Sequence, residues 1–554
     1  MTQPTGTRQH QTGVVLPARR AGAEGAGAAP GGGTRTEKDT MGAMEVPGDV
    51  LYGASTQRAV LNFPVSGRPV PGEVIRAYAL LKAACAAVNR DLGRLPGPKA
   101  AAITRVCAQI AGELPGQGGL AKHFPIDIFQ TGSGTSTNMN VNEVIANLVC
   151  VMHGQTIGRA KDPEWTGPGA GQDAPGVHPN DHVNMGQSSN DTFPSAMHIA
   201  ASTAIAWDLL PAVRLVAARL ESQAAAWDRI VKIGRTHLQD ATPIRLGQEF
   251  SGYAAQMRHA ERRLEGALDE LAELPIGGTA VGTGINAHEE FGGRVCAELT
   301  RMLASEAWTT AWAGAGAGGG ADRRRLVFRE SANHFEAQHA KDGFVEASAR
   351  VRTLAVSLSK IASDIRLMGM GPRCGLGELI LPAVQPGSSI MPGKVNPVIC
   401  ESMIMVCCQV IGNDHAVALG GLGGVGSLLD LNVAMPMMAA NLLDSARLLA
   451  AACRMFDASL LAGLKPDLAR CAELIEGSLA MCTSLVPVIG YDRAAALAKE
   501  ALKRGVTVRE LAYTELADAG AQDLAGNRLT RADIDRYLDP WSMTLPGGEG
   551  SAGG

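Results

Sequence analysis

One eleven-residue stretch holds the densest set of reactive groups in the chain, Gly387-Ser388-Ser389-Ile390-Met391-Pro392-Gly393-Lys394-Val395-Asn396-Pro397. Its glycines and prolines exclude a regular helix or strand, so the stretch predicts a shaped loop. Such a loop can direct hydroxyls, backbone N–H groups, a cation and an amide toward a common point. That combination suits a bound carboxylate with a proton transfer beside it, although the composition alone fits a plain connector equally well.

Three further polar clusters lie far from this loop along the sequence. They are Ser133-Gly134-Thr135, Ser188-Ser189-Asn190 and Thr236-His237. Each alone fits ordinary helix capping or turn chemistry. The functional alternative for the first cluster is a carboxylate cradle, because the dipole and the free N–H groups at a helix N-terminus favour anions.

The four clusters together resemble the class II fumarases of the fumarase/aspartase superfamily, from about Thr34 to about Trp541. The resemblance implies a hydro-lyase of the tricarboxylic acid cycle that reversibly hydrates fumarate to (S)-malate, with no cofactor and no metal. It also implies a homotetramer in which each active site takes residues from three subunits. The partners are then a small dicarboxylate substrate and further copies of this chain.

The resemblance also assigns roles to individual residues. Ser388 is the base that removes the proton from C3 of malate, activated by nearby N–H groups and by Lys394. His237 holds or activates the water, and Glu401 orients that histidine and favours its charged form. Donors to the developing dianion are Thr135, Asn190, Lys394 and Asn396. The implied substrate-binding residues are Ser133, Gly134, Thr135, Ser188, Ser189, Asn190, Thr236, Ser389, Lys394, Val395 and Asn396.

A second, outer anion site of the family corresponds here to His178, Pro179, Asn180 and Asp181. Family members tend to carry an arginine three positions before that histidine, where this chain has Pro175. We therefore expect the outer site to be altered or lost.

Other functions remain open at this point. Aspartases share the loop but carry glutamine in place of His237 and usually alanine in place of Gly393, so an ammonia-lyase is the nearest rival. Argininosuccinate and adenylosuccinate lyases resemble the chain less. A non-catalytic scaffold on this fold would be marked by loss of the serine or the lysine, and both Ser388 and Lys394 are present.

Composition narrows the class of protein. The 554 residues suggest several domains, and a formal net charge of −4 gives no electrostatic case for nucleic acid or an anionic membrane surface. The 11 cysteines are scattered and show neither zinc-ligand spacing nor a disulfide framework, which favours reduced thiols in a cytoplasmic enzyme. The most apolar run, Met403 to Ile411, is about half of the ~20 residues that a membrane span needs. The start has no apolar segment typical of a secretory signal.

Apolar residues at steps of three and four predict an all-α protein with five long helical segments in a central bundle. These segments cover residues 193–230, where Pro211 should kink or split the helix, and 250–271, 344–368, 397–411 and 437–464. Four such bundles are expected to associate into a tetramer with a many-helix core.

The expected domain organisation has four parts. Residues 1–33 form a disordered tail, 34–185 an N-terminal α domain, 186–465 the central bundle, and 466–554 a small C-terminal α domain. Two stretches rich in glycine, 155–176 and 308–325, are expected to be surface insertions.

Overall fold

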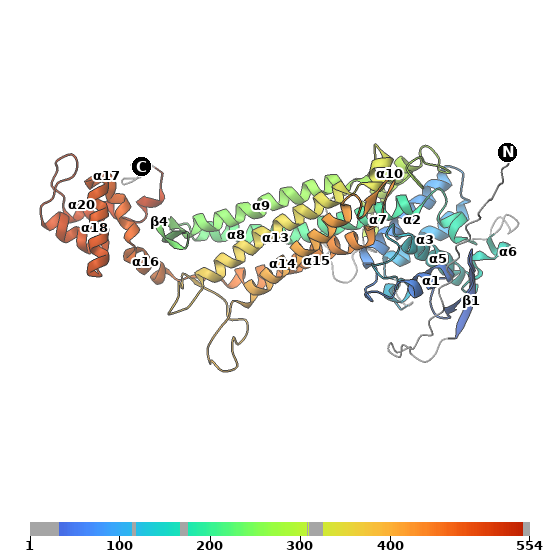
Figure 1. The fold of residues 1–554 in the computed structure, drawn as a ribbon, viewed down its shortest axis with the longest axis horizontal. Coiled ribbons are helices and arrows are strands. Elements are labelled where there is room, and N and C mark those ends of the chain that lie inside the picture. Colours follow the sequence, from blue (N-terminus) through green and yellow to red (C-terminus); the bar gives the residue numbers. More distant parts are fainter. Residues whose placement is uncertain (1–32, 114–117, 167–175, 307, 310–324, 547–554) are drawn as a thin grey trace, which may run out of the picture.

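The computed structural model describes residues 33–113, 118–166, 176–306, 308–309 and 325–546. Five long helical segments run side by side along the molecule, as the sequence predicts (Figure 1). They are α7 (Ser189–Ala204) continuing into α8 (Leu210–Ala226), α9 (Leu246–Leu271), α13 (Asp342–Met368), α14 (Val398–Gly421) and α15 (Met435–Ser459). The predominantly helical fold is therefore confirmed.

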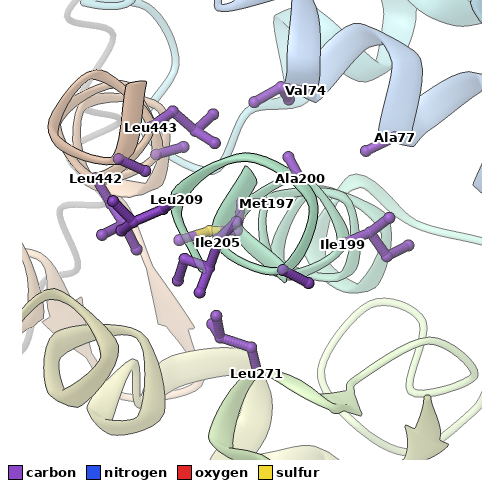
Figure 2. Close-up of a cluster of buried hydrophobic side chains, with 14 of the residues drawn as sticks. Val74, Ala77, Met197, Ile199, Ala200, Ile205, Leu209, Leu271, Leu442 and Leu443 are labelled. Atoms are coloured by element: carbon purple, nitrogen blue, oxygen red, sulfur yellow. The ribbon is translucent and has the colours of Figure 1, made fainter. Parts of the chain in front are cut away.

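The bundle forms because each long helix has an apolar face. On α9, Phe250, Met257, Leu264 and Leu271 recur at helical spacing and are fully buried. Figure 2 shows side chains of α7 meeting those of α9, α15 and α2 (Gly72–Asp91). Burying one such Leu, Ile or Met side chain contributes about 1.5–3 kcal/mol, so this packing holds the helices together.

Proline in the first long segment is accommodated without a break in the helical path. A π-helical turn, η3 (Ile205–Leu209), joins α7 to α8 and lies directly before Pro211. Proline has no N–H to donate, and in the first turn of α8 it needs none. The kink or split that the sequence predicts at Pro211 thus takes the form of this wider π-helical turn.

The helix α14 is longer than predicted. The sequence predicts an end at Ile411, before the polar residues Asn413-Asp414-His415, yet the helix continues to Gly421. The polar residues are tolerated inside the bundle because they have partners: Asp414 accepts from Ser348 Oγ at 2.7 Å and pairs with Arg352 at 3.0 Å. The predicted end was wrong because these partners lie on another helix.

Two helical segments of the described residues are long and apolar enough to cross a membrane, Ser189–Ala226 and Val398–Gly421. A bent pair, Leu468–Gly477 with Leu479–Ile489, makes up to three. The expectation that no segment has this length was wrong, because it counted only the run Met403 to Ile411. In the apolar 18-residue stretch of each segment, 67% of the first and 39% of the second is buried inside the chain.

The N-terminal part packs against one end of the bundle (Figure 1). Its elements are β1 (Thr34–Asp39), β2 (Gly42–Pro47), α1 (Ala54–Asn62), α2, α3 (Gly97–Ala111), α4 (Leu120–His123), α5 (Thr135–Met152), η1 (Arg159–Lys161), α6 (Pro163–Thr166) and η2 (Pro179–Val183). Residues 1–32 of the predicted tail, 167–175 of the first predicted insertion and 310–324 of the second lie outside the described residues.

Short two-stranded sheets lie between the helices, and the sequence did not predict them. The antiparallel pair β3 (Val231–Thr236) and β4 (Gln239–Arg245) is the histidine hairpin, in a region predicted only as a turn. The smaller elements between the long helices are β5 (Glu273–Leu274), α10 (Phe291–Leu303), β6 (Arg329–Glu330), α12 (His334–His339), β7 (Leu379–Ile380), β8 (Ser427–Leu428) and β9 (Leu431–Asn432).

The C-terminal part lies beyond the other end of the bundle (Figure 1). Its elements are η5 (Leu461–Gly463), β10 (Lys465–Pro466), α16 (Leu468–Gly477), η6 (Leu479–Leu485), α17 (Val486–Ile489), α18 (Tyr491–Arg504), α19 (Val508–Ala512), η7 (Tyr513–Asp518), α20 (Arg531–Tyr537) and η8 (Ser542–Thr544). Its apolar core, from Ile475 to Leu538, is separate from the core that runs from Val46 to Leu464. The domain boundaries at 185 and 465 remain predictions.

Candidate active site

Two of the predicted clusters come together where two helices begin. We call residues 133–135 and 188–190 the cradle. The hydroxyl of Thr135, at the start of α5, lies 2.8 Å from that of Ser189, at the start of α7, and 2.9 Å from that of Ser133. Two converging helix N-termini with several hydroxyls form a site suited to a carboxylate.

Glycine is required inside the cradle. Gly134 has φ +73°, and a Cβ there would come within 1.9 Å of the ring of Phe193. The tight approach lets α5 begin directly against α7, so the two sets of hydroxyls share one surface.

A carboxylate that sequence reasoning left without a role holds the cradle in place. Asp191 accepts from the backbone N–H of Ser188 at 2.9 Å, and from those of Gly277 at 3.2 Å and Thr279 at 3.0 Å. Burial raises the pKa of Asp191 to about 7. The glycine-rich turn at 277–284 therefore supports the start of α7, and Asn190 Nδ2 donates to the carbonyl of Ala280 at 2.8 Å.

A buried lysine lies behind the cradle, and no sequence pattern indicates its role because it falls within an apolar helix. Lys82 on α2 donates to Asn184 Oδ1 at 2.9 Å, and the same oxygen accepts from Asn138 in the first turn of α5 at 3.2 Å. Burial lowers the pKa of Lys82 to about 8. The hydrogen bonds of Lys82 and Asn138 to Asn184 thus hold the first turn of α5 on its buried side.

The predicted loop, residues 387–397, leads into α14, and we call it the serine loop. Its base is closed by Gly387 N donating to Lys394 O and by Asn396 Nδ2 donating to Gly387 O, both at 2.8 Å. At its tip, Ser388 Oγ accepts from the N–H groups of Ile390 at 3.2 Å and Met391 at 3.1 Å. Two N–H donors on one hydroxyl favour its negatively charged form.

His237 lies at the tip of the histidine hairpin. His237 and Leu238 have φ values of +56° and +60°, which is the left-handed pair of a tight two-residue turn. The turn leaves Thr236 and His237 exposed to solvent. Lys394 and Glu401, the latter in the first turn of α14, are also exposed.

One chain keeps the cradle apart from the other predicted residues. The serine loop leads directly into the first residue of α14. The cradle lies near the other end of that helix: Met435 follows α14 in the chain, and its backbone N–H donates at 3.0 Å to the carbonyl of Gly132, next to the cradle. The 24 residues of α14 span about 36 Å. Between Ser189 and the histidine hairpin lie the 38 helical residues Ser189–Ala226, about 57 Å.

The histidine hairpin and the serine loop leave from the same end of the bundle (Figure 1). Arg235, two residues before His237, pairs at 2.8 Å with Glu378, which precedes the serine loop. The structure thus groups the predicted residues into a cradle at one end and a pair of exposed loops at the other. The predicted partnership of Glu401 with His237 stays a prediction.

At the predicted outer anion site, the ring of His178 turns back onto the backbone that follows it, while Asn180 and Asp181 stay exposed. His178 Nδ1 accepts from the backbone N–H groups of Asn180 at 3.3 Å and Asp181 at 3.1 Å, so the ring caps η2 after Pro179. Burial lowers the pKa of His178, which favours the neutral ring. A neutral acceptor beside the Asp181 carboxylate is a poor anion ligand. That the outer site is altered stays a prediction.

No group of three or more His, Cys, Asp or Glu side chains in the described part of the chain is arranged to hold a metal ion.

Comparisons with known proteins agree with the fold. Residues 42–317 and 322–412 match the lyase family, and residues 481–545 match the fumarase C C-terminus. The architecture and these matches define a lyase. The chain is 49% identical over 509 residues to the class II fumarate hydratase of Corynebacterium glutamicum, covering 92% of this chain and 96% of that protein.

Comparison with solved structures also points to the lyase family. The recombinant class II fumarase of Schistosoma mansoni superposes with a TM-score of 0.82 at 36% identity, over 93% of this chain and 100% of that one. A fumarate lyase:delta crystallin from Brucella melitensis, bound to cobalt, superposes with a TM-score of 0.79 at 39% identity, over 93% of this chain and 100% of that one. The chain belongs to the class II fumarase family.

Proposed function

We propose that the protein is a fumarate hydratase that interconverts fumarate and (S)-malate in the tricarboxylic acid cycle of the cytoplasm. The main support is the presence of His237, where aspartases carry glutamine, in a chain 49% identical to a class II fumarate hydratase over 92% of its length. The 11 free cysteines suit a reducing compartment.

In the dehydration direction, Ser388 Oγ takes the proton from C3 of malate. The electron pair of the C–H bond passes into the adjacent carboxylate, which becomes a dianion held by Lys394, Asn396 and the cradle. The C2–O bond then breaks, the leaving hydroxide takes a proton from His237 and departs as water, and the double bond of fumarate forms. The N–H groups of Ile390 and Met391 make Ser388 a better base by stabilising its alkoxide.

The active enzyme in this proposal is a homotetramer, because a single chain holds the cradle and the serine loop about 36 Å apart. A second copy, running antiparallel, brings its serine loop to the cradle of the first. The candidate contact is the face of α14, which carries Met405 and Leu419 at 67% and 57% exposure. Sedimentation velocity tests this: a monomer with full activity would exclude shared sites.

The reaction is tested by the ultraviolet absorbance of the fumarate double bond, with malate and separately with aspartate as substrate. We expect the band to grow with malate only, and to grow at about one hundredth of that rate in His237→Asn. Growth with aspartate instead would make the protein an ammonia-lyase. No growth with either substrate, from a well-folded assembly, would favour the non-catalytic scaffold.

A further inference from the structure

A buried ionic cluster joins the two elements that carry His237 and Ser388. Glu378 has a fully buried side chain, and its Oε2 lies 2.8 Å from Arg235 Nη1 and 3.6 Å from Lys232 Nζ. Lys232 is 2% exposed and also pairs with Glu249 at 2.9 Å. We call these four residues the ionic hub.

The hub sits where three segments of the chain meet. Arg235 and Lys232 belong to β3 of the histidine hairpin, and Glu378 lies at the start of the arm that leads to the serine loop. The carbonyl of Glu378 accepts from Asp467 N at 2.9 Å, at the N-cap of α16. Arg470 on α16 holds the same arm, donating to Leu376 O at 2.9 Å and to Gly375 O at 3.1 Å.

Stability alone is a weak explanation for this arrangement. A buried ion pair loses much of its attraction to desolvation, and an apolar replacement of similar volume is often as stable. Glu378 also keeps one carboxylate oxygen, Oε1, buried without a hydrogen-bond partner. The pair instead fixes the relative position of the two segments that carry it, because a buried arginine–carboxylate contact tolerates little displacement of either backbone.

We propose that Arg235 and Glu378 are positioning residues for the hydratase: their ion pair fixes the histidine hairpin and the arm of the serine loop to one rigid hub. This rests on the proposed function, which gives both loops their roles. Without the pair, His237 and Ser388 leave their reactive positions while the cradle, at the far end of the bundle, still binds substrate. The loss therefore falls mainly on kcat, with a smaller rise in KM because Lys394 and Asn396 of the serine loop also contact the substrate carboxylate.

Glu378→Gln tests the pairing, since it keeps the shape and removes the charge that faces Arg235. We expect kcat to fall at least tenfold, KM to rise by a smaller factor, and hydrogen–deuterium exchange to accelerate in residues 236–240 and 381–396 together. Arg235→Lys serves as a second variant, because it keeps the positive charge and removes the planar guanidinium group. It should show the same changes in kcat and in hydrogen–deuterium exchange, but smaller.

The matched control is Asp457→Asn, which breaks the 2.8 Å pair between Asp457 on α15 and Arg219 on α8, a pair that joins two bundle helices and neither loop. It should lower the melting temperature comparably and leave kcat and both loops unchanged. Unchanged exchange in either loop of Glu378→Gln, or an equal fall in kcat in the control, would overturn the proposal. Absence of hydratase activity in the unaltered protein would reject the proposed function, and the exchange measurement would still decide whether the pair orders the loops.

Discussion

The two ends of the bundle hold their functional residues in opposite ways. At the cradle end, Ser133, Thr135 and Ser189 are linked hydroxyl to hydroxyl across two helices and are backed by buried Asp191 and Lys82. At the other end, the side chains of the serine loop and the histidine hairpin project from loops, with His237, Lys394 and Glu401 exposed to solvent.

In the proposed enzyme, this difference assigns different tasks to the folding of one chain and to the assembly of several. Folding of one chain completes a carboxylate-binding surface, because its hydrogen bonds run between α5, α7 and the turn at 277–284. The proton-transfer groups are presented outward, at about 36 Å from that surface along α14. On this view substrate binding is preorganised within a chain, and catalysis begins when chains combine.

The largest effect is expected from Ser388→Ala. Loss of the base should lower kcat about a thousandfold, measured by fumarate absorbance with malate. The melting temperature should stay nearly unchanged, since the loop is remote from the core. Ser389→Ala, the neighbouring hydroxyl, is the control and should lose far less. Retention of more than a tenth of the activity by Ser388→Ala would assign the base to another group.

A second test uses the separation directly. Ser388→Ala and Asn190→Ala are each inactive in our proposal, one at the serine loop and one at the cradle. If these two residues reach a site from different chains, random mixed assemblies contain about a quarter of sites with both residues intact. Activity of refolded mixtures should then rise to about that fraction. Mixtures as inactive as the separate variants would place both residues on one chain.

The sequence predicted what depends on local pattern. Apolar residues such as Phe250 and Met257 repeat every three or four positions, so the long helices and their buried faces were predictable. The cradle and loop residues were found because their strings resemble a family, and the family itself is confirmed. Their roles stay predictions until tested.

What the sequence did not predict depends on contacts between distant segments. The end of α14 was misplaced because Asp414 finds Ser348 and Arg352 on α13. The hairpin β3–β4 was missed because its strands carry no clear alternation of apolar and polar residues. The role of Asp191 was missed because its partners, Gly277 and Thr279, lie more than eighty residues away.

A smaller effect is expected at the cradle. Thr135→Val keeps the size of the side chain and removes the hydroxyl that contacts Ser133 and Ser189. We expect KM for fumarate to rise about tenfold, equivalent to about 1.4 kcal/mol, with kcat changed much less. Thr104→Val, on the surface of α3, is the control because its hydroxyl only bonds back to Ala100 O. A change confined to kcat would place Thr135 in the chemical step.

The smallest effect concerns pH. Burial lowers the pKa of His198, on α7 below the cradle, from 6.5 to about 4. The unfolded chain therefore binds more protons than the folded one between pH 4 and 6.5, so stability rises with pH through that window and is complete above it. The ring also lines an open cleft with Glu273 and Lys341, so solvent screening reduces the gain to on the order of 1 kcal/mol.

Urea unfolding of the unaltered protein and of His198→Gln at pH 5 and pH 7 measures this term. Glutamine can still donate to the carbonyl of Glu273, which His198 Nδ1 contacts at 3.0 Å, but it does not titrate. The difference in unfolding free energy between the two pH values should therefore be smaller in His198→Gln. An equal difference in both proteins would mean that the cradle end draws its pH response from other buried groups, of which Asp191, with a pKa of about 7, is the nearest in the same helix.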